Sequence, residues 1–151
     1  MLQTDQTSDA CKLADLTFHL LAHFREKEIR FAETHGLTQA EFRCLKYFGA
    51  NECMSNKQIS ERMKLTPGRL TRIIDSLIEK NYMMREIDKS DRRYMQVNLS
   101  VNGNIILQRL NDDYINIHRE ILSGIELDQQ KPLITAMSHL VSALRVWSPK
   151  S

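Results

Sequence analysis

The hydrophobic pattern of this sequence changes from a helical period to a strand period over residues 83–99, and that change limits the folds open to the chain. Before residue 82, apolar residues recur at three- and four-residue steps, as they do on one face of a helix. From Met83 to Ile87 and from Tyr94 to Leu99 the pattern is that of two short strands joined by a charged turn. Because an isolated two-stranded hairpin is marginally stable, this hairpin must pack against the helices.

Capping signals divide the rest of the chain into helices. Ser, Thr and Asp side chains accept a hydrogen bond from a free N–H at a helix start, and glycine or asparagine adopts the left-handed conformation at a helix end. These signals predict a first helix over 9–34, capped by Asp9 and ended by His35-Gly36, and a second helix opened by the Thr38–Glu41 capping box and closing near Gly49. A short third helix is opened by the Ser55–Gln58 box. The fourth helix runs from Thr66-Pro67 to about Lys80, with Asn81 as its stop.

Two further helices are predicted after the hairpin. Ser100 caps a helix over 101–123, which Gly124 breaks. Asp128 is expected to cap the last helix, with Pro132 in its first turn, where proline is tolerated. A short third strand at Cys53-Met54 could extend the hairpin into a sheet.

The predicted order of elements is that of a winged helix-turn-helix. We therefore expect a mainly α fold with a small β-hairpin wing, and the low content of 5 glycines and 3 prolines disfavours a turn-dense all-β fold. The first helix and the last two are long, and each carries an apolar stripe that a domain of this size cannot fully cover, which predicts a second copy of the chain. We expect residues 37–99 to form the winged helix-turn-helix, and residues 1–36 and 100–151 to form a dimerisation region intertwined with it.

A basic region in the middle of the chain points to an anionic partner. Between Lys46 and Arg93 there are 11 Lys and Arg against 7 Asp and Glu, although the whole chain carries a net charge of only +2. A helix that reads DNA needs small and hydrogen-bonding residues in its first turns, where its free N–H groups also face phosphate. Taken alone, the predicted helix over 66–80 is equally consistent with an ordinary amphipathic helix that has a solvated basic face. The predicted DNA-contacting residues of this helix are Thr66, Pro67, Gly68, Arg69, Thr71 and Arg72.

The turn of the hairpin supplies a second set of candidate contacts. Asp91, Arg92 and Arg93 lie in this turn, and an arginine there can enter a narrow minor groove, which concentrates negative potential. The Asp91 carboxylate is placed to hold the Arg93 guanidinium by two hydrogen bonds. A solvated charged turn is the alternative, but a basic helix and a basic turn separated by one strand together favour a DNA-binding site.

One motif spans the turn, the second strand and the start of the next helix. It reads Asp91-Arg-Arg93-Tyr-Met-Gln-Val-Asn-Leu99-Ser100-Val-Asn-Gly103. Upstream lie Leu37-Thr38 with Phe42, Ile59-Ser-Glu-Arg-Met63 and Leu70-Thr-Arg-Ile-Ile-Asp-Ser-Leu-Ile-Glu-Lys80. Together these segments resemble the multiple antibiotic resistance regulator (MarR) family of bacterial winged-helix repressors, whose wing carries Asp-x-Arg, five residues and Leu-Thr-x-x-Gly. The order of elements is similar to the family's from about residue 10 to residue 147.

The resemblance implies a sequence-specific, DNA-binding transcriptional regulator that acts as a homodimer. Its first, fifth and sixth helices would form the dimer interface. Each protomer would place the helix over 66–80 in a major groove, and the wing over 83–99 in a minor groove, of a pseudo-palindromic operator in double-stranded DNA. Arg93 matches the family's wing arginine, and Asp91 matches the carboxylate that positions it. Family members are usually repressors that release DNA on a small-molecule or oxidant signal.

Three positions depart from the family pattern. Ser100 stands where threonine is commoner, and Asn81 stands where glycine is usual. Both replacements keep the capping or left-handed conformation that the position needs. Arg69 is not constant in the family, so the operator sequence cannot be transferred from relatives.

The sequence gives less information about the signal that would release DNA than about the fold. Cys11 is a candidate redox sensor, although the first helix lacks the tyrosines that surround the cysteine in the peroxide-sensing branch of the family. His19 and His23 are spaced as a metal-binding pair, but no convincing third ligand accompanies them, so we predict neither a metal nor a cofactor. A small-molecule effector would need an apolar pocket, which we expect among the first, second and fifth helices.

Other classes of function are disfavoured. The chain has no glycine-rich nucleotide loop, zinc-protease motif or hydrolase nucleophile motif, so we do not expect an enzyme. Three scattered cysteines, the lack of a long apolar run and a polar, acidic N-terminus predict a cytoplasmic protein without membrane contact. A winged-helix adaptor that binds protein and has no DNA role remains the alternative.

Overall fold

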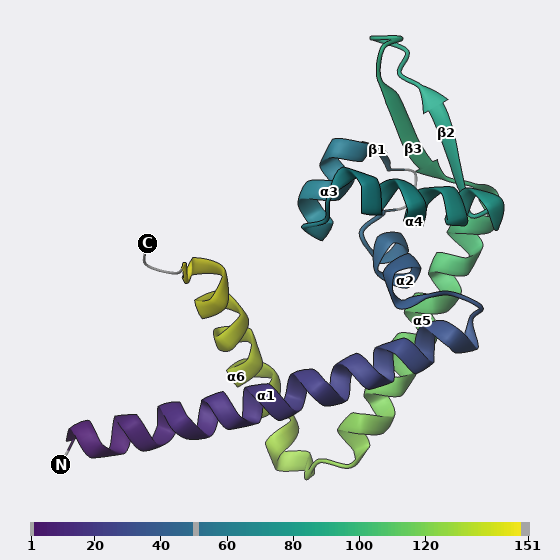
Figure 1. The fold of residues 1–151 in the computed structure, drawn as a ribbon. Helices are drawn as coiled ribbons and strands as arrows, with labels where there is room; N and C mark the ends of the chain where they lie inside the picture. The colour runs from purple at the N-terminus through teal and green to yellow at the C-terminus, as the bar shows by residue number, and fades with distance from the viewer. Residues whose placement is uncertain (1, 50–51, 149–151) are drawn as a thin grey trace. The chain divides into compact units, whose positions relative to one another are not determined.

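The computed structural model describes residues 2–49 and 52–148 of the chain, and it divides into two compact units, residues 1–107 and 108–151. The second unit contains the end of α5 and all of α6. Figure 1 shows the elements. In chain order they are α1 (Leu2–Thr34), α2 (Gln39–Lys46), β1 (Cys53–Ser55), α3 (Asn56–Met63), α4 (Pro67–Glu79), β2 (Met83–Ile87), β3 (Met95–Leu99), α5 (Val101–Ser123) and α6 (Leu127–Val146).

The described elements confirm the mainly α fold with a hairpin wing. The strands form an antiparallel sheet in the order β1-β3-β2, so the predicted third strand is present on the free side of β3. Met83 lies opposite Leu99 and Arg85 opposite Val97. On this face of β3 Val97 and Leu99 are buried, which anchors the base of the hairpin to the helices.

Several of the local capping signals act where the sequence predicted them. Complete capping boxes open α2 at Thr38 and α3 at Ser55, with both reciprocal hydrogen bonds formed in each. Gly36, after α1, and Asn81, after α4, have φ values of 69° and 62°, in the left-handed region. These residues set where α2 and α3 begin and where α1 and α4 end.

Three predicted boundaries are wrong. α1 begins at Leu2 rather than at Asp9, because no Pro or Gly interrupts the upstream residues and an established helix extends at little cost. Asp9 is therefore inside the helix, 4.0 Å from the Lys12 ammonium. α2 ends at Lys46, before Gly49, and the Tyr47 N–H donates to the carbonyls of Cys44 and Leu45 as the helix tightens.

The start of α6 also differs from the prediction. Glu126 occupies the N-cap position and makes no side-chain capping bond, whereas Asp128 lies in the first turn. The earlier start places Pro132 inside the helix, beyond its first turn. Proline lacks an N–H, so the helix gives up one internal hydrogen bond there.

One apolar face of α4 faces the core of the first unit. Leu70, Ile73, Ile74 and Leu77 are buried in that core, and Ile78 is half-buried. The other side chains of the core include Phe31, Leu37, Phe42, Leu45, Phe48, Met54, Ile59, Met83, Val97 and Leu99. This packing determines which face of α4 turns outward.

The base of the wing is joined to α5 by close packing at Gly103. The Ser100 N–H donates to the Tyr82 carbonyl at 3.0 Å, and the Ser100 hydroxyl accepts from the Gly103 N–H at 2.9 Å. A Cβ added to Gly103 would lie 1.9 Å from the Tyr82 carbonyl oxygen, so only glycine fits. The motif glycine thus has a structural role in fixing where the wing begins.

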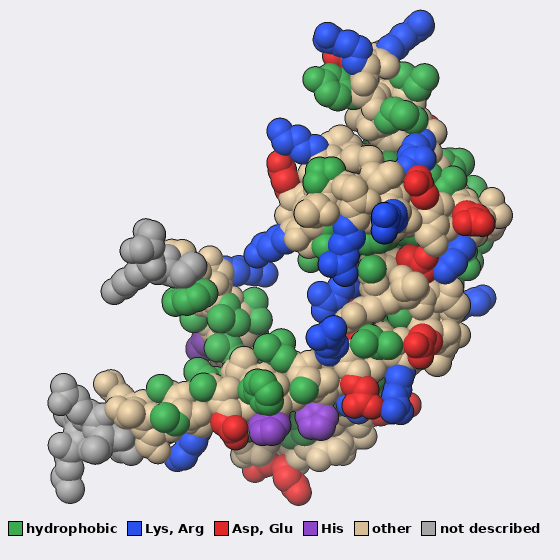
Figure 2. All heavy atoms as spheres, viewed as in Figure 1, with side chains coloured by type: hydrophobic (Ala, Val, Ile, Leu, Met, Phe, Trp, Pro, Cys, Tyr) green, Lys and Arg blue, Asp and Glu red, His purple; other side chains and the backbone are tan. Residues whose placement is uncertain are grey.

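Large apolar side chains are exposed on the two terminal helices. On α1 they are Leu13, Leu16, Phe18, Leu20 and Leu21, and on α6 they are Leu127, Leu133, Ile134, Met137, Val141, Leu144 and Val146. Figure 2 shows hydrophobic side chains on the visible faces of both helices. Among residues 2–49 and 52–148, no helix combines the length and apolarity needed to cross a membrane.

Candidate nucleic-acid interface

The first turns of α4 present polar groups to solvent. The Thr66 hydroxyl oxygen accepts from the Arg69 N–H at 3.4 Å and caps the helix, with Pro67 at its first position. Arg69 and Arg72 are exposed because Leu70 and Ile73 turn the opposite way into the core. The result is a solvent-facing helix start with two guanidinium groups beside it.

Gly68 and Thr71 complete this surface in different ways. A Cβ on Gly68 would meet no atom within 4 Å, so the fold does not require glycine there and the space above it is open. Thr71 is half-buried, and its hydroxyl donates to the Pro67 carbonyl at 2.9 Å. Thr71 therefore has only its oxygen lone pairs to offer an outside group, whereas Thr66 retains its hydroxyl hydrogen.

The hairpin turn holds Arg93 as the sequence predicted. The Arg93 Nε donates to Asp91 Oδ1 at 3.1 Å and its Nη2 donates to Asp91 Oδ2 at 3.0 Å, while the Arg93 N–H also donates to Oδ1. The hydrogen bonds from Arg93 lower the pKa of Asp91, and Asp91 in turn raises the pKa of Arg93. The Arg93 side chain is 85% exposed, so its guanidinium is oriented without being buried.

Asp88 shapes the same turn. Its carboxylate accepts from the Ser90 N–H at 2.8 Å, from the Ser90 hydroxyl at 2.6 Å and from the Gln96 amide at 3.0 Å. These hydrogen bonds, the Ser90 hydroxyl first, lower the pKa of Asp88. Arg92 is exposed beside this braced turn.

An ion pair links the wing to α4. The Arg85 guanidinium on β2 donates to Asp75 on α4. Figure 2 shows Lys and Arg side chains at the tip of the hairpin and over the part of the first unit that carries α2 and α4. The exposed basic groups of the helix and the wing thus belong to elements tied together within one unit.

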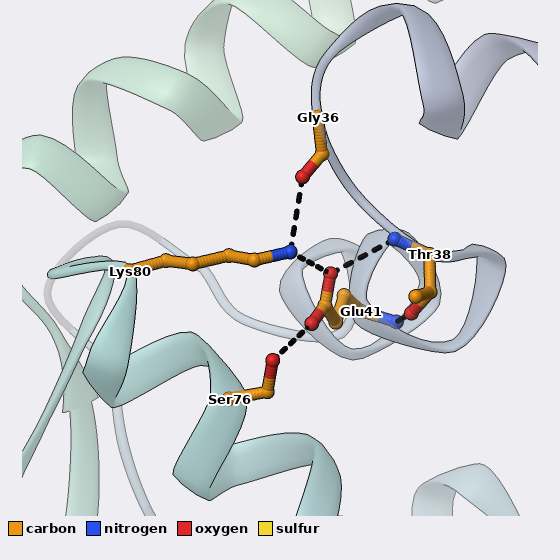
Figure 3. Close-up of polar contacts among 5 residues, drawn as sticks. All are labelled: Gly36, Thr38, Glu41, Ser76 and Lys80. Carbon is orange, nitrogen blue, oxygen red and sulfur yellow. Dashed lines mark hydrogen bonds and ion pairs between the residues drawn. The ribbon is translucent and has the colours of Figure 1, made fainter.

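The buried carboxylate of Glu41 lies at the C-terminal end of α4. Glu41 is 3% exposed and accepts from Lys80, from Ser76 and from the Thr38 N–H (Figure 3). Sequence reasoning identified Glu41 only as a capping residue and missed its pairing with Ser76 and Lys80. It also missed the Asp75–Arg85 pair. The helical spacing of Ser76 and Lys80 on one face of α4 was the one available signal.

The candidate sensor residues lie apart from this surface in the sequence. Cys11 and Cys53 are exposed, whereas Cys44 is buried, and burial raises the pKa of its thiol to about 12. His19 and His23 are exposed on α1, and within the described residues no three His, Cys, Asp or Glu side chains are grouped to hold a metal. A cavity of about 340 Å³ lies between α1 and α2, lined by Leu21, Phe24, Arg25, Glu28, Gln39 and Arg43.

Known sequences place the chain among transcription regulators. The sequence model described as the MarR family matches residues 37–95, which span α2 to the start of β3. The uncharacterized HTH-type transcriptional regulator YkoM of Bacillus subtilis is 29% identical over 112 residues, covering 74% of this chain and 73% of YkoM.

Solved structures show the same fold. A mutant of S. aureus MepR superposes with a TM-score of 0.75 at 16% identity, covering 86% of this chain and 97% of MepR. A second MepR mutant, bound to an oligodeoxyribonucleotide, superposes with a TM-score of 0.62 at 15% identity, covering 87% of this chain and 97% of MepR. At these identities the likeness extends to the fold alone.

Proposed function

The chain belongs to the MarR family of helix-turn-helix transcriptional regulators, and from this premise we propose that it binds a pseudo-palindromic operator in double-stranded DNA as a homodimer. One observation carries the proposal. Arg69 and Arg72 at an exposed, capped helix start and the braced Arg93 at an exposed hairpin tip belong to elements joined by the Arg85–Asp75 pair. A reader of two adjacent grooves needs this combination.

In the proposed complex, the start of α4 enters the major groove. Arg69 and Arg72 reach guanine edges or phosphates, and Thr66 donates its free hydroxyl hydrogen. Thr71 accepts through its remaining lone pairs, while Pro67 and the open space above Gly68 allow close approach of the backbone. The N–H groups of this first turn add a favourable field for phosphate.

The wing supplies the minor-groove contact. Arg93 enters the groove with its guanidinium oriented by Asp91, and Arg92 lies beside it on the phosphate backbone. The Asp91 carboxylate is half-exposed and already hydrogen-bonded, so keeping its charge beside DNA costs little free energy. Its hydrogen bonds also limit the rotation of the Arg93 side chain. The MepR mutant bound to an oligodeoxyribonucleotide is a precedent for DNA binding by a protein of this fold.

The exposed apolar faces of α1 and α6 support the homodimer. Leu16 is 66% exposed and Leu144 is 59% exposed in the single chain, and exposed apolar rows of this kind mark interfaces. We assign residues 1–36 and 100–151 to dimerisation and residues 37–99 to DNA reading. A two-fold dimer would present two copies of α4 to half-sites about 34–36 Å apart.

We further propose that the regulator is a repressor released by a small-molecule or oxidant signal, and that it acts in the cytoplasm, where bacterial DNA lies. The cavity between α1 and α2 combines the apolar side chains of Leu21 and Phe24 with the charged groups of Arg25, Glu28 and Arg43, a composition suited to an amphipathic effector. Cys11 is exposed and is the alternative site of the signal. The family relationship favours a non-enzymatic role.

Selection of genomic fragments on the purified protein tests the proposed function. Recovered fragments should share an inverted repeat, and affinity for that repeat should fall with salt at a log–log slope of about −0.9 for each phosphate contact. Failure to enrich any fragment, or a slope near zero, would instead favour the protein–protein adaptor.

A further inference from the structure

Three segments of the first unit meet at the carboxylate of Glu41 (Figure 3). The Thr38 N–H, in the turn after α1, donates to Oε2 at 2.8 Å. Lys80, at the end of α4, donates from Nζ to the same oxygen at 2.7 Å and to the Gly36 carbonyl at 3.0 Å. The Ser76 hydroxyl of α4 donates to Oε1. One carboxylate therefore connects the end of α4 to the turn between α1 and α2.

The charge state of Glu41 keeps this connection intact at neutral pH. Burial raises the pKa of its carboxyl, but the hydrogen bonds from Lys80, Ser76 and Thr38 outweigh burial, and the net pKa is below its usual value. Glu41 is therefore ionised, and both oxygens are occupied by donors from other segments. Lys80 retains access to solvent, with its side chain 34% exposed.

Because α4 is a continuous helix, a small tilt at its Lys80 end displaces its Arg69 end. At 1.5 Å per residue, α4 is about 20 Å long, so a tilt of about 5° at the Lys80 end moves the Arg69 end by roughly 1.7 Å. That shift is enough to break a hydrogen bond to a base. The apolar contacts of Leu70, Ile74 and Leu77 favour burial but are not directional. A charged, hydrogen-bonded contact sets orientation more sharply.

We propose that Lys80 is a positioning residue for DNA reading, which acts through Glu41 and the Gly36 carbonyl to set the angle at which α4 presents Arg69 and Arg72. The inference rests on the proposed function. Lys80 itself lies at the opposite end of α4 from the groups that would enter the groove. Its role is therefore to orient the helix relative to the turn after α1.

A double variant, Glu41→Gln with Lys80→Met, tests this role without changing the net charge of the protein. The glutamine retains the capping box, since glutamine serves at that position, and no uncompensated charge is left buried. We expect affinity for the selected operator to fall roughly tenfold, the cost of about one misaligned base contact. Affinity for random-sequence DNA of equal length should stay within about twofold, because that binding depends on charge.

The matched control is Glu79→Gln with Lys27→Met, which also removes one charge of each sign from exposed side chains of the same unit. It should bind both DNAs as the wild type does. Equal operator affinity of the Glu41/Lys80 variant and the control would overturn the inference, and so would equal losses on operator and random DNA. Absence of operator binding by the wild type would overturn the proposed function instead.

A milder substitution keeps the inference testable if the double variant does not fold. Ser76→Ala removes one hydrogen bond to Glu41 and leaves every charge in place. We expect a two- to fourfold loss of operator affinity with unchanged random-DNA binding, measured on protein whose folding is verified by its unfolding transition. Wild-type operator affinity of this folded variant would overturn the inference.

Discussion

The helices α4 and α6 both carry an apolar face, but only α4 covers that face within the single chain. α4 buries Leu70, Ile73, Ile74 and Leu77, whereas α6 has no buried residue. α4 also has a side-chain cap at Thr66, while Glu126 gives α6 none. An apolar stripe in the sequence therefore identifies a surface that needs covering, and the structure shows which stripe the chain covers itself. We propose that a second copy covers the other.

Lysine substitutions on the apolar face of α6 should have the largest effect, because they test whether a second copy of the chain covers that face. We expect the wild type to sediment at micromolar concentration with a mass near twice 17.6 kDa. Met137→Lys with Leu144→Lys should reduce the mass to that of one chain, because a two-fold interface would bury two copies of each lysine ammonium, at several kcal/mol per ion.

The control for this variant places lysines at exposed polar positions of the same helix. Gln129→Lys with His139→Lys should leave the mass unchanged. A wild type that sediments as a single chain would show that the exposed face of α6 is not covered by a second copy.

A matched pair of leucine truncations measures the difference in burial. Leu77 on α4 is 0% exposed, and Leu77→Ala should lower the free energy of unfolding by about 2–5 kcal/mol, since it removes buried methyl groups and leaves a cavity. Leu127 on α6 is 82% exposed in the single chain, and Leu127→Ala should cost less than about 0.5 kcal/mol when it is made in the monomeric Met137→Lys/Leu144→Lys background, where no second copy covers it. Chemical denaturation gives both values, and similar losses would contradict the contrast.

Arg93→Ala tests whether the wing contributes to reading beside α4. We expect operator binding to weaken by about 1–3 kcal/mol, as for the loss of one groove contact, with no change in the unfolding midpoint. Arg119→Ala, on the exposed surface of α5, should leave affinity unchanged. Wild-type affinity of Arg93→Ala would mean that the wing does not touch DNA.

The caps of the two helices give the smallest expected difference. Thr66→Ala should lower the free energy of unfolding by about 1 kcal/mol in the absence of DNA, because the Arg69 N–H loses its acceptor. Glu126→Ala should have little effect, since the Glu126 side chain makes no capping bond. Thermal unfolding of the two variants compares them directly, and the contrast fails if Glu126→Ala costs as much as Thr66→Ala.

Short-range features were predictable because they depend on neighbours in the sequence. The boxes at Thr38 and Ser55, the left-handed Asn81 and the Asp91–Arg93 contact each involve residues at most three positions apart or a single residue. Two of the three wrong helix boundaries arose where two local signals competed. Asp9 and Asp128 are good capping residues, but helix extension in α1 and an earlier start in α6 placed both inside helices.

By itself, the sequence determined the order of elements, the helix ends that have strong caps, and the exposed arginines of α4 and the wing. Only the tertiary structure decided how α4 is held: Glu41 with Lys80, and Asp75 with Arg85. The reason is physical. A capping bond forms between groups that the backbone already brings together, whereas these ion pairs exist only after apolar packing has placed α4 against α2 and the wing against α4.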